Sequence, residues 1–85
     1  MSEADGQRQR IEATIMELLA PYNKRGVALT PETKIAADLN IDSADVLNFI
    51  MEVEDAFDID IPVNDLTDVH TLAQLVDLVE RRVQG

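Results

Sequence analysis

The sequence predicts a small all-α protein, an acidic four-helix bundle of three longer helices and one short helix with a long first loop. Its apolar periodicity is helical throughout the chain. The chain has 85 residues and no cysteine, so it should form one small domain with a modest core and no disulfide framework. We expect a single domain over residues 1–85, with its core over about residues 8–83 and a tail over residues 1–6.

The first helix is indicated by Ile11, Ile15, Leu18 and Tyr22, which fall at i, i+4, i+7 and i+11. Pro21 disfavours helical geometry at the preceding residue, so this helix should end near residue 20.

A long connection over residues 21–41 follows. A structureless loop of this length is unusual in a compact domain, so we expect it to be partly ordered or functional. Thr30-Pro31 resembles a helix cap followed by proline at the first helical position, which predicts one helical turn near residues 31–38. Four apolar side chains can hold the connection to the core: Val27, Leu29, Ile35 and Leu39.

The second helix should run from about residue 43 to residue 57. Asp42 can cap it, and Asp45 adds negative charge to its first turn. Five apolar residues make its predicted core face: Val46, Phe49, Ile50, Val53 and Phe57.

The same helix carries a second apolar line, well away from the core face. This line consists of Ala44, Leu47 and Met51, and its flanks are polar or acidic. We interpret it as a contact surface for partners. For Leu47 alone, a place in a broad core stripe is an equal alternative. The predicted docking residues are Ala44, Asp45, Leu47, Asn48, Met51, Glu54 and Asp55.

The remainder of the chain predicts an extended link at residues 58–62, a brief third helix at about 62–67 and a last helix ending near 83. Thr71 and Gln74 fit a capping box at the start of this last helix. Arg81 and Arg82 suit the negative end of its dipole. Its predicted core face is Leu72, Leu75, Val76, Val79 and Val83.

Charge excludes several classes of function. The formal net charge is −10, and no Lys or Arg occurs between Lys34 and Arg81. A strongly negative face repels nucleic acid and anionic membranes and attracts basic protein patches, although solubility alone is an alternative reason for such charge. No long apolar run or signal segment is present, so we expect a cytoplasmic protein without membrane insertion.

Ser43 is the residue that indicates most about the function of the chain. It stands at the start of the most acidic helix, and the chain has only one other serine, Ser2. The single histidine, His70, precedes a helix cap, and nothing in the spacing pairs it with Ser43 as a catalytic base. Asp58 and Asp60 fail the EF-hand pattern, so no metal site is predicted. Ser43 therefore resembles a passive attachment point more than a nucleophile.

The stretch from Asp38 to Pro62 resembles the acyl carrier protein family, whose pattern is roughly D-L-G-x-D-S-L-x-x-V-E-L-V-M-x-L-E-E-x-F-x-x-x-I-P. The matching positions are Asp38-Leu39, Asp42-Ser43, Phe49-Ile50-Met51, Glu54-Asp55, Phe57 and Ile61-Pro62. An Asp-Ser pair alone is not specific, but one at a helix start with this downstream register is. The flanking helices extend the resemblance over about residues 8–83.

The resemblance implies that Ser43 carries 4′-phosphopantetheine, installed from coenzyme A by a phosphopantetheinyl transferase, with Asp42 flanking it. The thiol of that arm would hold acyl groups as thioesters. The protein would then be a monomeric carrier and not a catalyst. It would serve acyl-loading, synthase and acyltransferase enzymes with basic patches in fatty-acid, lipid or polyketide-type biosynthesis. The predicted acyl cleft is lined by Val46, Ile50, Phe57, Ile61, Leu72 and Val76.

The sequence departs from the family pattern at three places. Ala44 replaces the usual leucine, Asn48 replaces the usual glutamate, and Asn40 and Ile41 occupy the region of the usual glycine. These changes favour a specialised pathway. Two other functions stay open: a peptidyl or aminoacyl carrier, and a noncovalent acidic helical adaptor in which Ser43 is only a helix cap.

Overall fold

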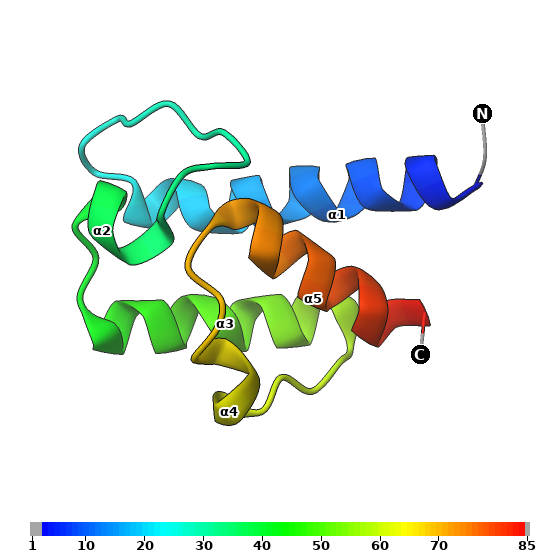
Figure 1. Ribbon diagram of the computed structural model, residues 1–85. Helices are drawn as coiled ribbons and strands as arrows, with labels where there is room; N and C mark the ends of the chain where they lie inside the picture. The colour runs from blue at the N-terminus through cyan, green and yellow to red at the C-terminus, as the bar shows by residue number, and fades with distance from the viewer. Residues whose placement is uncertain (1–2, 85) are drawn as a thin grey trace.

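The computed structural model describes residues 3–84, and in that range the chain forms five α-helices and one 3-10 helix, with no β-strand (Figure 1). The elements are α1 (Glu3–Leu19), η1 (Ala20–Tyr22), α2 (Ile35–Leu39), α3 (Ser43–Phe57), α4 (Val63–Leu66) and α5 (Leu72–Gln84). The predicted bundle with three longer helices is confirmed, and α2 and α4 are its short helices.

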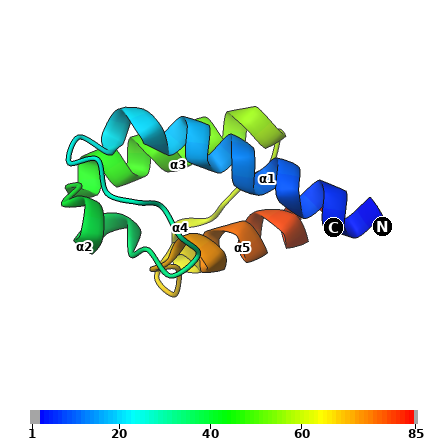
Figure 2. The same ribbon diagram turned by 90° about the horizontal axis from the view of Figure 1, so that it is seen from above.

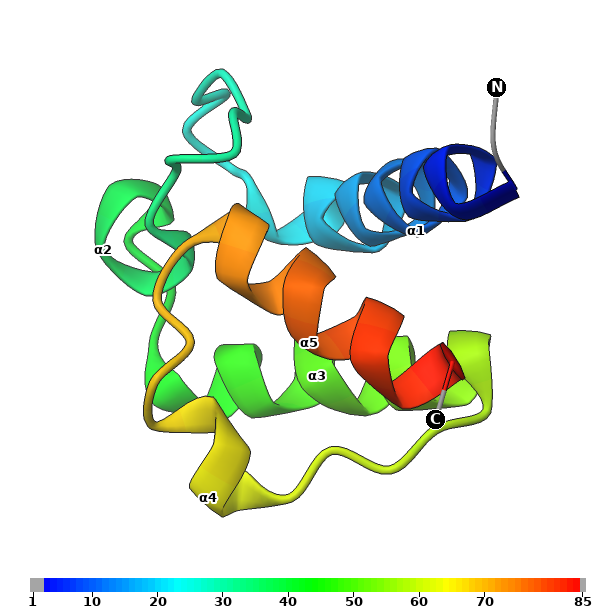
Figure 3. The ribbon, with the colours of Figure 1, turned by 45° about the vertical axis from the view of Figure 1, so that its right-hand side comes forward.

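The three longer helices pack in two layers. α1 and α3 lie side by side, and α5 crosses over them obliquely (Figures 1 and 2). α2 packs against the end of α3 where α3 begins, and α4 lies in the connection that leads from α3 to α5 (Figure 3). This arrangement places both short helices around the first half of α3.

The core is built mainly from the predicted stripes, although Val46 and Phe57 of the predicted α3 core face are only half-buried. The buried apolar residues are Ile11, Ile15, Leu19, Ile35, Leu39, Phe49, Ile50, Val53, Ile61, Leu72, Leu75, Val76, Leu78 and Val79. In α1, Leu19 is fully buried, whereas the predicted Leu18 and Tyr22 are only half-buried. In α5, Leu78 is buried, although it lies off the predicted face. The prediction that Val83 lies in the core is wrong, because this residue is 37% exposed in the last turn of the helix.

α1 also begins earlier than expected. Its helical hydrogen bonding starts at Glu3, so residues 3–6 belong to the helix and not to the predicted tail. The first two residues of that tail lie outside the described residues. At its other end, the helix stops at Leu19 as predicted, and Pro21 stands within the 3-10 turn that follows.

The predicted caps of α3 and α5 are present. Asp42 has extended backbone geometry, and its carboxylate accepts a hydrogen bond from the Asp45 N–H at 2.9 Å. At α5, the Gln74 N–H donates to the Thr71 hydroxyl at 3.2 Å, and the Thr71 N–H donates to the Gln74 side chain at 3.0 Å. These local bonds fix where both helices begin.

The short helix of the first connection begins later than its sequence signals predicted. The Ile35 N–H, which a helix starting at Pro31 would bond to the Pro31 carbonyl, instead donates to the His70 carbonyl at 2.9 Å. The Pro31 carbonyl accepts from the Ala73 N–H at 2.9 Å. Pairing with the start of α5 therefore displaces the first turn, and α2 starts at Ile35.

Candidate functional site

Ser43 stands at the first position of α3 with its side chain exposed to solvent. The two oxygen acceptors at this helix start both come from Asp42: its carboxylate accepts from Asp45, and its carbonyl accepts from the Val46 N–H at 3.0 Å. The Ser43 hydroxyl makes no hydrogen bond to another residue in the described range 3–84. The helix cap is therefore Asp42, and the Ser43 hydroxyl is left available for chemistry.

A tight left-handed turn brings the chain from α2 into α3. Asn40 ends α2 with φ 54°, and its N–H donates to the Ala36 carbonyl. Ile41 donates to the same carbonyl at 3.1 Å. Asparagine is among the few residues that adopt this conformation readily. Asn40 thus supplies here the turn for which glycine is the common choice, and this departure from the family pattern leaves the local backbone intact.

The outer face of α3 is apolar and exposed. Leu47 is 48% exposed and Met51 is 60% exposed, and Ala44 lies on the surface with them. The structure therefore places Leu47 outside the core. Asn48 and Asp55 are exposed beside this line. We call the strip made by Ala44, Leu47, Asn48, Met51 and Asp55 the outer face of α3.

The other two predicted docking residues, Asp45 and Glu54, are half-buried. The Asp45 N–H belongs to the helix cap described above. The carboxylate of Glu54 accepts a hydrogen bond from the Ile61 N–H at 2.8 Å. Glu54 therefore fixes the link between α3 and α4, a role that the sequence pattern did not indicate.

An apolar cavity of about 370 Å³ opens beside the first turns of α3. It is walled by α2, α3, α4 and the segment that leads into α5. Its lining residues are Lys34, Ile35, Ala36, Ala37, Val46, Phe49, Ile50, Leu66, Val69 and His70. We call this the α2–α4 cavity. Val46, which is one helical turn beyond Ser43, belongs to its wall, so the cavity is within reach of a group attached at Ser43.

Only two of the six predicted cleft residues, Val46 and Ile50, line the α2–α4 cavity. Leu72 and Val76 border a different, small hollow beside α1. Phe57 is half-buried against the core, and Ile61 is buried within it. The cavity-lining residues that the sequence did not predict lie mainly on α2, α4 and the segments next to them. Helical periodicity does not indicate where such short helices are placed in the fold.

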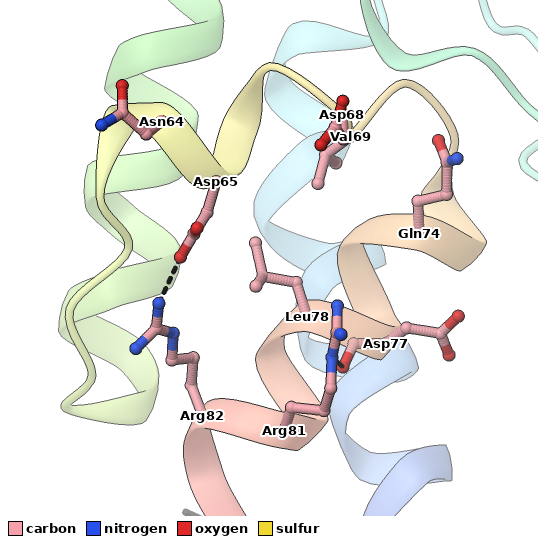
Figure 4. A pocket seen from close by; sticks show the side chains of 9 residues that line it. All are labelled: Asn64, Asp65, Asp68, Val69, Gln74, Asp77, Leu78, Arg81 and Arg82. Atoms are coloured by element: carbon pink, nitrogen blue, oxygen red, sulfur yellow. Dashed lines mark hydrogen bonds and ion pairs between the residues drawn. The ribbon is translucent and has the colours of Figure 1, made fainter.

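A second, polar hollow of about 540 Å³ lies on the surface between α4 and α5 (Figure 4). Arg82 forms an ion pair with Asp65 across it, and the Arg81 side chain donates to the Asp77 carbonyl at 3.4 Å. The ion pair ties the short helix α4 to the last helix. Val69 contributes to both this hollow and the α2–α4 cavity, so α4 and the segment after it form the wall between them.

His70 has no hydrogen bond to Ser43 within residues 3–84. Its backbone N–H donates to the Gln74 side chain at 2.7 Å, while its side chain is exposed. The site thus has an available hydroxyl and an apolar cavity, and no base among the described residues is hydrogen-bonded to the hydroxyl.

Comparison with known proteins gives the family of this site. Residues 13–79 match the family described as "Phosphopantetheine attachment site". The chain is 32% identical to an acyl carrier protein of Syntrophobacter fumaroxidans over 74 residues, which cover 84% of this chain and 89% of the relative. The chain belongs to the acyl carrier protein family. It is also 44% identical over 55 residues to a probable acyl carrier protein of Caulobacter vibrioides, covering 65% of this chain and 64% of that one. A third relative, an acyl carrier protein of Chlorobium phaeobacteroides, is 37% identical over 54 residues, 64% of this chain and 69% of the relative.

Membership in this family makes the protein a carrier and not a catalyst, with 4′-phosphopantetheine as its prosthetic group. A carrier of this kind interacts with a phosphopantetheinyl transferase and with biosynthetic enzymes. Within residues 3–84, none of the helices has the length and apolar character needed to cross a bilayer.

Proposed function

We propose that Ser43 is the attachment residue and that this carrier moves acyl thioesters between the enzymes of a fatty-acid, lipid or polyketide-type pathway in the cytoplasm. The observation that supports this proposal most is the division of roles at the start of α3. Asp42 makes the capping bonds, and the adjacent Ser43 hydroxyl is exposed without a hydrogen bond to another described residue. Capping alone therefore gives no reason for a serine at this position.

The start of α3 also suits a phosphodiester on Ser43. The Asp45 and Val46 N–H groups are occupied by Asp42, which leaves the Ser43 and Ala44 N–H groups at the start of the helix without a partner among the described residues. An anion at a helix N-terminus gains roughly 0.3–1 kcal/mol when it is exposed. When bound, the arm supplies the thiol that this cysteine-free chain lacks.

The α2–α4 cavity is the proposed shelter for the acyl cargo. Each methylene that leaves water gains at most about 0.8 kcal/mol, minus the cost of widening the cavity. Val46 and Ile50 would contact the cargo from α3, and Leu66 and Val69 from the opposite wall. Protection of the thioester from an external nucleophile should therefore increase with chain length, and equal cleavage of short and long cargoes would contradict this assignment.

The outer face of α3 is the proposed docking surface for the transferase and for the acyl-loading, synthase and acyltransferase enzymes. It combines exposed apolar side chains with a strongly acidic surrounding, which fits partners with basic patches. Ala44 and Asn48 make this face smaller and less charged than the family pattern. We therefore place the carrier in a specialised lipid, polyketide or modified-acid pathway.

The test of the attachment residue uses the two serines of the chain. Purified apo-protein is incubated with coenzyme A and a promiscuous phosphopantetheinyl transferase, and its intact mass and peptide map are measured. We expect one phosphopantetheine on Ser43 in the wild type and in the Ser2→Ala control, and none in Ser43→Ala. Modification of Ser43→Ala would overturn the proposal, as would folded wild-type protein that stays unmodified while a control carrier is loaded.

A further inference from the structure

The charge around the α2–α4 cavity differs from that of the rest of the molecule. The chain contains 17 Asp and Glu residues, yet none of those whose side chains the structure describes lines this cavity. The two lining residues with ionisable side chains are Lys34 and His70, and both can carry positive charge. No other Lys, Arg or His occurs between these two positions in the sequence. The acidic half of the chain thus encloses an apolar cavity whose ionisable lining groups are both basic.

Backbone hydrogen bonds hold Lys34 and His70 next to each other. Lys34 forms an isolated antiparallel bridge with Thr71, and the Ile35 N–H donates to the His70 carbonyl at 2.9 Å. The His70 N–H is fixed in turn by the Gln74 side chain. Because backbone atoms make the bonds of Lys34 and His70, both side chains can be replaced without loss of these contacts.

Both side chains are available to a ligand. Among the described residues, the Lys34 ammonium has no carboxylate within ion-pair distance, and the imidazole of His70 has no hydrogen-bond partner. Asp38 accepts from the backbone N–H of Lys34 at 2.8 Å, so that carboxylate is engaged with the main chain. Lys34 and His70 are both exposed at the edge of the cavity, and an anionic group there would remain partly in water.

The helix α2 separates Lys34 from the attachment position. Ser43 follows the C-terminal end of α2, whereas Lys34 precedes its first residue. The five residues of α2 span roughly 8 Å at about 1.5 Å per residue. A chain that enters beside Val46 and follows α2 therefore passes apolar side chains first and reaches Lys34 and His70 last.

Building on the proposed function, we propose that the preferred cargo is an acyl chain whose far end carries a carboxylate, such as a half-thioester of a dicarboxylic acid. The apolar wall suits the methylene segment, and the two basic side chains supply charge-assisted hydrogen bonds to the terminal carboxylate. A chain that ends in a methyl group would bury the same methylenes without using Lys34 or His70. The cavity volume falls within the usual range for small-ligand sites.

The test compares two cargoes of equal length on Ser43. The transferase loads apo-protein from octanoyl-coenzyme A or from octanedioyl-coenzyme A, which has one free carboxylate. The rate of thioester cleavage by hydroxylamine is then measured and divided by the rate for the same coenzyme A thioester. We expect the octanedioyl cargo to be cleaved about tenfold more slowly than the octanoyl cargo, a ratio equivalent to about 1.4 kcal/mol. We also expect this difference to shrink at high salt.

Variants identify the groups responsible. Lys34→Gln/His70→Gln should bring the ratio of the two rates close to one, mainly because cleavage of the octanedioyl cargo becomes faster. Lys24→Gln is the matched control, because Lys24 is an exposed cation that does not line the cavity, and it should keep the wild-type ratio. As a second readout, the NMR signals of the His70 ring should shift with the octanedioyl cargo and stay in place with the octanoyl cargo.

The outcomes separate this inference from the proposed function. If mass analysis shows that Ser43 is never loaded, the proposed function fails and the cargo preference falls with it. If both cargoes load and are cleaved at equal relative rates, or if octanoyl is better protected, the preference for a carboxylate end is overturned while the carrier function stands. A tenfold difference that survives in the double variant would also overturn the roles of Lys34 and His70.

Discussion

Asp42 and Ser43 are neighbours in sequence and differ in what their side chains contact. The Asp42 carboxylate is bonded to the third residue of α3, whereas the Ser43 hydroxyl faces solvent. The family motif therefore combines a residue that stabilises the helix with a residue that is free to be modified. This division separates the effect of each substitution on stability from its effect on modification.

We predict that substitutions of these two neighbours differ in their effect on stability. Asp42→Ala removes the cap and should lower the free energy of unfolding by about 0.5–2 kcal/mol. Ser43→Ala should change it by less than about 0.5 kcal/mol, since an exposed side chain without bonds is removed. Urea denaturation followed by circular dichroism measures both. A loss in Ser43→Ala as large as that in Asp42→Ala would mean that the serine is a capping residue after all.

The helix α3 has a buried side and an exposed side with different roles. Phe49 and Val53 are fully buried and hold the helix in the core, while Leu47 and Met51 are exposed without contributing to it. Because they are not needed for packing, substitutions on the outer face can be tested for binding alone.

We predict that Leu47→Gln/Met51→Gln weakens docking but leaves the fold stable. The free energy of unfolding should change by less than about 0.5 kcal/mol per substitution, as for other surface positions. The kcat/KM for phosphopantetheine transfer to Ser43 should fall about tenfold, or about 1.4 kcal/mol. Val63→Gln is the matched control, because Val63 is 69% exposed but lies on α4. An equal loss of transfer in the control would show that the outer face of α3 has no special role.

A side-chain bond also joins the first loop to α3. The Tyr22 hydroxyl donates to the Glu52 carboxylate at 2.6 Å, and the Tyr22 ring packs edge-on against Phe49 with ring centroids 6.0 Å apart. The hydrogen bond to Glu52, more than partial burial or the charges of Glu52 and Asp45, raises the pKa of Tyr22 to about 12. The neutral phenol is thus the form that the fold favours.

This pKa predicts a loss of stability at alkaline pH. The contribution of Tyr22 is fully present below its unfolded pKa of about 10 and is lost as pH rises toward 12, because only the unfolded state releases the proton in that interval. In Tyr22→Phe this part of the pH dependence should disappear. Phenolate absorbance reports the titration directly, since the chain has one tyrosine. A wild-type phenol that titrates near pH 10 would contradict the bond to Glu52.

Whether the sequence predicts the start of a helix depends on whether the first hydrogen bonds of that helix are made to nearby or to distant residues. α3 and α5 have local caps and continuous apolar stripes, and their starts at Ser43 and Leu72 follow from the sequence. α2 starts later than its sequence signals indicate, because its first bonds go to residues near position 70. The α2–α4 cavity was predicted only in part for the same reason, since its walls are short segments brought together by such distant contacts.

The net negative charge of the molecule affects both its folding stability and its association with partners. The formal net charge of −10 attracts basic partners, and it also makes the carboxylates of the folded chain repel one another. Opposing this repulsion, Arg8 pairs with Asp77 and Glu80, and Arg82 pairs with Asp65. These pairs link α1 and α4 to α5, but they are all partly exposed, and solvent-exposed pairs contribute little each.

Added salt shows whether the repulsion among carboxylates or the attraction within the ion pairs has the larger effect on stability, because it screens both. At about 0.1 M the screening length is about 10 Å, which weakens repulsion among many carboxylates more than it weakens a few short ion pairs. We therefore predict that added sodium chloride raises the free energy of unfolding while it slows association with the transferase. Urea denaturation and transfer kinetics over the same salt series measure the two effects.

A charge variant tests the cause of the salt effect. Asp55→Asn/Asp60→Asn/Asp68→Asn changes the net charge from −10 to −7 at three exposed positions that make no side-chain hydrogen bond to another described residue. This variant should be more stable than the wild type at low salt, and the difference should vanish as salt rises. If salt instead lowers the stability of the wild type, the exposed pairs of Arg8 and Arg82 outweigh the repulsion, and the acidic surface has little cost to the fold.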